Sequence, residues 1–65
     1  MSESESEVEK MYRMGREDGE SVQKYMSPEE IEEYWFTPEE AMANQEKTED
    51  PEMKAYYKGY LSRFD

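Results

Sequence analysis

Carboxylates are the side chains of this sequence that could do chemistry, and they gather in its middle. The 65 residues include 18 acids and 8 bases, for a net charge of −10, and no histidine or cysteine. Residues 27–50 hold nine acids and one base, Lys47, so this block alone carries −8. Its acids are Glu29, Glu30, Glu32, Glu33, Glu39, Glu40, Glu46, Glu49 and Asp50. Such a density favours basic partners and disfavours direct binding of nucleic acid or an anionic membrane.

The common kinds of enzyme chemistry lack their residues. Without histidine or cysteine there is no base-assisted nucleophile, and the sequence has no glycine-rich phosphate loop, His-Glu-x-x-His motif or EF-hand spacing. Paired carboxylates are abundant, but a general acid must be desolvated, and most of these lie on the polar faces of predicted helices. We therefore predict a protein that is not an enzyme and that uses no cofactor or metal.

The carboxylates also mark where helices begin. Ser6-x-x-Glu9 fits a capping box, in which each side chain satisfies a backbone N–H of the other residue. Ser27-Pro28-Glu29-Glu30 and Thr37-Pro38-Glu39-Glu40 form a repeat at a spacing of ten residues. Each supplies an N-cap hydroxyl, a proline at the first helical position and two glutamates that the helix dipole favours. Asp50-Pro51-Glu52 is a fourth start of the same kind.

These starts predict an all-α fold, a small bundle of four helices. A long N-terminal helix over about 7–26 precedes two short helices, over about 28–35 and 38–46, and a C-terminal helix over about 51–64. The Ser/Glu run 1–5 is predicted to be a disordered acidic N-terminus. Residues 6–65 are predicted to form a single small helical domain.

Two glycines lie inside the long helix, where each costs roughly 1 kcal/mol relative to alanine. Asp18-Gly19 is also a turn signal that could end the helix early. The apolar residues after Gly19 keep the phase of those before Gly15, which favours a continuous helix. Both glycines fall at the centre of the apolar face.

The C-terminal helix carries an aromatic ridge. Its members are Met53, Tyr56, Tyr57, Tyr60, Leu61 and Phe64. We expect the tyrosine rings to approach the backbone at the two glycines of the long helix, with Ile31 and Trp35 closing the core. Tyr56-x-x-Gly59 echoes Tyr12-x-x-Gly15, but Gly59 lies off the ridge, so we treat the echo as chance.

A partner-binding surface is predicted where the acidic block meets aromatic residues. The predicted residues are Glu29, Glu30, Glu32, Glu33, Tyr34, Phe36, Glu39 and Glu40. Aromatic rings flanked by carboxylates suit an arginine-rich surface, through cation–π contacts and charge-assisted hydrogen bonds. Carboxylates at helical spacing also resemble the regular charge of a nucleic-acid backbone. Helix-start chemistry explains four of these glutamates without any partner, so a merely solvated face is the alternative.

In size, acidity, aromatic content and lack of catalytic residues, the chain resembles the small phage and mobile-element inhibitors that mimic DNA, such as anti-restriction and anti-CRISPR proteins. This resemblance is one of class and rests on no shared motif. It implies a stoichiometric inhibitor that occupies the basic channel of a nucleic-acid-binding host defence protein in the host cytoplasm.

The alternative is a small helical protein–protein interaction or dimerisation module, a regulator whose acidity only serves solubility. A homodimer is compatible with the sequence. No apolar run approaches the ~20 residues of a membrane span, so a cytoplasmic protein without membrane contact is expected.

Overall fold

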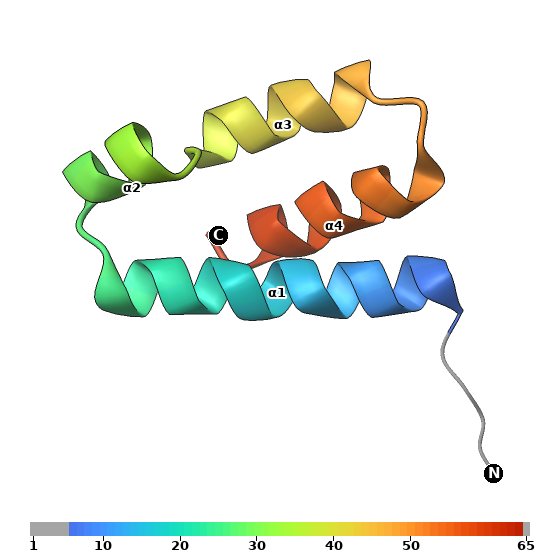
Figure 1. Ribbon diagram of the computed structural model, residues 1–65, viewed down its shortest axis with the longest axis horizontal. Coiled ribbons are helices and arrows are strands. Elements are labelled where there is room, and N and C mark those ends of the chain that lie inside the picture. The colour runs from blue at the N-terminus through green and yellow to red at the C-terminus, as the bar shows by residue number, and fades with distance from the viewer. Residues whose placement is uncertain (1–5, 65) are drawn as a thin grey trace, which may run out of the picture.

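The computed structural model describes residues 6–64, which form four helices (Figure 1). The helices are α1 (Glu7–Tyr25), α2 (Pro28–Tyr34), α3 (Pro38–Lys47) and α4 (Pro51–Ser62). The described residues include no strand, and each helix ends within two residues of its predicted end. The predicted all-α bundle is therefore confirmed. The predicted disordered segment, 1–5, lies outside the described residues.

The helices begin at the predicted caps. In α1, α2 and α3 the N-cap hydroxyl and the glutamate three residues later form reciprocal capping boxes. The Glu30 N–H donates to Ser27 Oγ at 3.2 Å, and the Ser27 N–H donates to Glu30 Oε1 at 2.9 Å. Thr37 and Glu40 form the same pair of bonds at 3.1 and 2.9 Å. Side chains at these positions thus satisfy donors that a helix start would otherwise leave unpaired.

α1 is one continuous helix through Gly15 and Gly19, as predicted, and no turn interrupts it. α4 runs beside it in the same direction (Figure 1). Gly15, Gly19 and Gly59 are all buried, and none of them has a positive φ. Their role is therefore to leave space between helices and not to permit an unusual backbone conformation.

The two helices touch reciprocally at glycines. A Cβ atom added to Gly15 would overlap the carbonyl oxygen of Tyr56, and one added to Gly59 would overlap the carbonyl oxygen of Tyr12. Each glycine Cα thus faces a carbonyl group of the other helix, an arrangement that favours weak Cα–H···O contacts. At Gly19 the added Cβ would lie 2.8 Å from the Tyr60 oxygen. Side chains at these positions would keep the helices apart.

Small residues spaced by four lie on both sides of this crossing. α1 contributes Gly15 and Gly19, and α4 contributes Ala55 and Gly59, all of them buried. Helix pairs that approach closely through small residues use the same spacing. Small side chains make few van der Waals contacts, but here the backbones of the two helices contact each other directly and replace them.

Two expectations about this packing are wrong. The echo between Tyr12-x-x-Gly15 and Tyr56-x-x-Gly59 is not chance, because it marks the two halves of the reciprocal contact. The tyrosine rings are also not what lies nearest to Gly15 and Gly19: the nearest atoms belong to the α4 backbone and to the Arg63 side chain. α4 has two contact faces: a small-residue face toward α1, and an aromatic face whose Tyr57 and Tyr60 rings contact Phe36.

The core lies where α1 and α4 meet α2 and α3. Its buried cluster is Val22, Ile31, Ala41 and Tyr60. Tyr60 has no exposed surface, and its hydroxyl donates to the Phe36 carbonyl oxygen at 2.7 Å. The Phe36 ring lies 4.5 Å from the Tyr60 ring and 5.7 Å from the Tyr57 ring, centroid to centroid. The burial predicted for Ile31 is confirmed.

Trp35 does not close the core as expected, since it is 41% exposed. α2 ends at Tyr34, and the backbone of Trp35 has left the helical region, with φ −135° and ψ −139°. A continued helical turn would have buried Trp35 on the side of Ile31. The chain that leaves the helix at Trp35 instead brings the next side chain, Phe36, onto the core.

Candidate functional site

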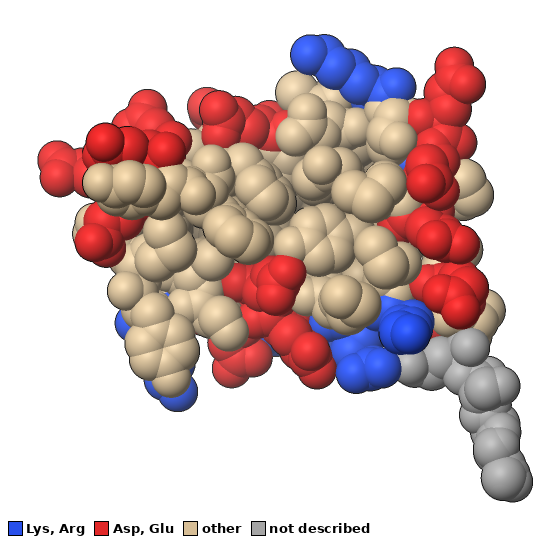
Figure 2. Space-filling view, viewed as in Figure 1, with Lys and Arg blue, Asp and Glu red and all other residues tan. Residues whose placement is uncertain are grey.

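The predicted binding surface spans α2, the α2–α3 elbow (the bent segment 35–37 between the two helices) and the first turn of α3. Its six glutamates are all exposed: Glu29, Glu30, Glu32, Glu33, Glu39 and Glu40. Figure 2 shows carboxylates over α2 at one end of the molecule, over the α3–α4 turn and the start of α1 at the other, and over the middle of α1, with a largely uncharged area above this last group. Residues 26–46 contain no lysine or arginine. The segment therefore supplies no base of its own to neutralise these acids.

Capping separates the six glutamates into two groups. Glu30 and Glu40 accept hydrogen bonds from the Ser27 and Thr37 backbone, so their side chains hold helix starts. The remaining four are Glu29, Glu32, Glu33 and Glu39. Three of these lie on α2 at spacings of three and four residues, which places their Cβ atoms roughly 5–6 Å apart on neighbouring positions of one helix surface. These four carboxylates are the ones that a partner could pair with at no cost to a cap.

The two predicted aromatic residues lie in different surroundings. Tyr34 is 70% exposed and follows Glu33 at the end of α2. Phe36 is half-buried and packs against the core, so less of it is available to a partner. Trp35, between them, was not predicted as a binding residue. The structure exposes it beside the carboxylates, and the sequence signal that could have found it is the proline at 38, which limits the length of α2.

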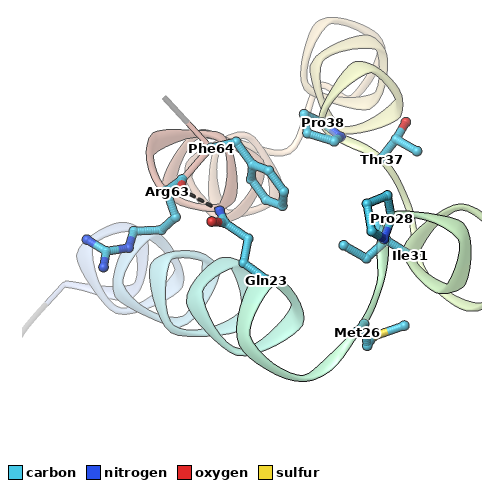
Figure 3. A pocket seen from close by; sticks show the side chains of 8 residues that line it. All are labelled: Gln23, Met26, Pro28, Ile31, Thr37, Pro38, Arg63 and Phe64. Atoms are coloured by element: carbon cyan, nitrogen blue, oxygen red, sulfur yellow. Dashed lines mark hydrogen bonds between the residues drawn. The ribbon is translucent and has the colours of Figure 1, made fainter.

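A second feature is a cavity of about 460 Å³ between the C-terminal ends of α1 and α4 and the α2–α3 elbow (Figure 3). Its lining residues are Gln23, Met26, Pro28, Ile31, Thr37, Pro38, Arg63 and Phe64. The Gln23 side chain donates to the Arg63 carbonyl oxygen, and the Arg63 guanidinium pairs with Glu20 at 3.7 Å. No acid lines the cavity. Arg63 is the charged residue of this lining.

Within residues 6–64, the fold perturbs the titration of Tyr56 and Tyr60. Burial raises the pKa of Tyr60 from 10 to about 12, and the negative charges of Asp18 and Glu40 add to the effect. Burial also raises the pKa of Tyr56, whose hydroxyl donates a hydrogen bond to the Asp18 carboxylate. The Tyr56 hydroxyl joins α4 to α1, and the Tyr60 hydroxyl joins α4 to the segment between α2 and α3. The perturbation therefore reflects packing within the bundle.

Alkaline pH should therefore weaken the fold through these two tyrosines. Their pKa values are higher in the folded chain than in the unfolded one, so their contribution is complete below about pH 10. The contribution of Tyr60 is lost as the pH rises through about 12, and that of Tyr56 at higher pH still. We expect the urea midpoint, followed by circular dichroism, to fall between pH 9 and pH 12. The fall should be shallower in a Tyr56→Phe/Tyr60→Phe variant. Equal slopes in the two proteins would show that these hydroxyls are not responsible.

Neither a metal centre nor a membrane span is visible in the described part of the chain. Among residues 6–64, no group of three or more acidic side chains is arranged to hold a metal ion. No helix in the same range is both long enough and apolar enough to cross a membrane.

The fold and the surface together define a small all-α bundle with an acidic, partly aromatic face on α2 and the start of α3. Comparisons of the chain with protein families, with curated proteins and with solved structures found no match.

Proposed function

We propose that this protein is a non-enzymatic acidic binding protein, a stoichiometric inhibitor that mimics nucleic acid. In this proposal its acidic face docks on the basic surface of a nucleic-acid-binding host defence protein. The observation that carries the proposal is the set of open carboxylates on α2 and α3. Glu29, Glu32, Glu33 and Glu39 are exposed and are not used in the capping boxes.

The free energy of these charges supports a role in binding a partner and not in stabilising the fold. Four like charges close together repel one another, so the cluster lowers stability slightly and is not required by the helix starts. A basic groove that binds phosphates gains free energy by releasing counterions, and it could accept a folded array of carboxylates in the same way. Exposed Tyr34 adds an apolar contact within the array. Affinity and rate of association should both depend on these charges.

Competition with DNA tests the proposal. The tagged chain is used at 50 mM NaCl to capture its partner, and DNA binding by the purified partner is then measured with increasing amounts of the chain. We expect DNA to be displaced at about one equivalent, and the complex to weaken steeply between 50 and 500 mM NaCl because exposed charge pairs are screened. A partner that binds DNA equally well when saturated with the chain would refute nucleic-acid mimicry.

A second candidate is favoured by apolar exposure outside the acidic face. Tyr25 is 75% exposed and Met42 is 54% exposed. Large apolar side chains at a surface are typical of protein interfaces when they lie together. In this candidate function the protein is an interaction or dimerisation module, and its complex should persist with little change at 500 mM NaCl. The salt series therefore distinguishes the two functions.

A further inference from the structure

We propose that Trp35 is an arginine-selective contact, which stacks on a guanidinium group of the basic partner. The inference rests on the proposed function. It adds to that function a residue that determines which basic surfaces are bound, and it names arginine over lysine as the preferred ligand.

The Trp35 ring is held in place before any partner binds. It stacks on Phe36, with ring centroids 5.5 Å apart and an interplanar angle of 17°. Phe36 in turn lies 4.5 Å from the fully buried Tyr60 ring, and the Tyr60 hydroxyl bonds the Phe36 carbonyl oxygen. A row of rings thus connects the core to the surface. Trp35 would lose little conformational freedom on binding, which favours affinity.

The ring is also accessible. One face of Trp35 is turned to Phe36, and the residue keeps 41% of its surface exposed. A large aromatic residue left open in this way, next to a structured elbow, differs from the exposed Tyr25. The ammonium group of Lys24 lies 5.6 Å from the centroid of the Tyr25 ring, which therefore already has a cation from its own chain.

The charge around Trp35 selects a cation. Glu32 and Glu33 precede it on α2, both exposed, and residues 26–46 contain no base. A second copy of this chain is a poor occupant, because each copy carries −10. A guanidinium is planar, weakly hydrated and able to stack on a ring while it bonds carboxylates, whereas an ammonium is compact and strongly hydrated. Indole is also the strongest aromatic partner for a cation.

Because Trp35 is the single tryptophan of the chain, its fluorescence reports on this position alone. The full chain is titrated at 50 mM NaCl with acetyl-tetra-arginine amide and, separately, with acetyl-tetra-lysine amide. We expect the arginine peptide to bind roughly three- to fivefold more tightly, as an exposed cation–π contact would produce, and to change the emission of Trp35 more strongly. Equal affinities for the two peptides would overturn the inference.

Variants separate stacking from simple apolar contact. Binding is followed by the anisotropy of fluorescein-labelled peptides, and folding by circular dichroism. Trp35→Leu should remove the arginine preference and leave lysine binding nearly unchanged, whereas Trp35→Phe should keep part of the preference. Tyr25→Leu is the matched control and should have no effect. Equal loss of both peptides in Trp35→Leu would mean that Trp35 has no selective role.

The same titrations keep this inference distinct from the proposed function. If both peptides bind equally and Glu32→Lys/Glu33→Lys abolishes their binding, the acidic face is a cation-binding surface but Trp35 does not select arginine. If the arginine preference is present but insensitive to those glutamates and to salt, Trp35 stacking stands and electrostatic mimicry fails. If neither peptide binds, the Trp35 inference is overturned.

Discussion

Gly15→Ala is expected to destabilise the protein by at least about 2 kcal/mol, although alanine is the better helix former. A Cβ at this position would overlap the Tyr56 carbonyl oxygen and lie 2.9 Å from the Tyr60 nitrogen. Both obstructing atoms belong to a helix backbone, so no rotamer change relieves the clash and the helices must separate. Overpacking typically costs roughly 1–3 kcal/mol, and a clash with rigid backbone lies at the upper end of this range or above it. The cost therefore outweighs the gain of about 1 kcal/mol in helix propensity by about 2 kcal/mol or more.

The loss is a large fraction of the stability of so short a chain, roughly 3–10 kcal/mol. Thermal unfolding followed by circular dichroism should show a fall in Tm of roughly 10 °C or more. Ser21→Ala, at an exposed position of the same helix, should change the free energy of unfolding by less than about 0.5 kcal/mol. An unchanged or higher Tm for Gly15→Ala would show that α1 and α4 do not meet backbone to backbone.

The other two buried glycines allow a graded test of the same contact. Gly59→Ala should match Gly15→Ala, because its Cβ would overlap the Tyr12 carbonyl oxygen and lie 3.1 Å from the Arg16 nitrogen. Gly19→Ala should cost less, since two of its three nearest atoms are in the Arg63 side chain. Combining Gly15→Ala with Gly59→Ala should cost less than the sum, because the first substitution already separates the helices.

Charge reversal on α2 is the prediction with the largest expected effect on function. Glu32→Lys/Glu33→Lys should weaken the complex with the captured partner roughly 30-fold or more at 50 mM NaCl. Each substitution replaces attraction with repulsion, and exposed pairs are worth roughly 0.2–1 kcal/mol each before the reversal is counted. Neither glutamate takes part in a capping box, so the helicity of the chain should be retained.

The matched control is Glu46→Lys/Glu49→Lys, at exposed positions near the other end of α3. Each Glu→Lys change adds two charges, so both variants carry −6 in place of −10. Affinity is measured for both at 50 and 500 mM NaCl, with far-ultraviolet circular dichroism as the check on folding. If the two variants lose affinity equally, net charge and not the α2 surface controls binding. If neither loses affinity, the acidic face is not the interface.

The contrast between the elements predicted well and those predicted badly has a physical basis. Helix starts depend on residues within one turn, so Ser27, Thr37 and their glutamates could be placed from the sequence. The continuity of α1 through Gly15 could also be inferred, because the phase of its apolar face is a local property. The exposed carboxylates of the predicted site follow from the same local patterns.

The predictions that failed concern contacts between elements. A helical wheel ranks the faces of a helix by their hydrophobicity. It therefore favoured the aromatic ridge of α4 over the face that holds Ala55 and Gly59. The small-residue face of α4 is the one that meets α1, because two helix backbones can approach closely only where neither carries a large side chain. A second small-residue pattern on α4 was visible in the sequence, but its partner was not.

The sequence by itself determined the four helices, their capping and the concentration of negative charge at 27–50, since these depend on neighbours along the chain. Only the tertiary structure decided that Phe36 is drawn into the core while Trp35 stays at the surface, and that Gly15 and Gly59 face carbonyl groups across a helix pair. The reason is that those outcomes depend on how closely segments far apart in the sequence approach one another. The residue pattern along a single helix gives no information about the distance to another helix.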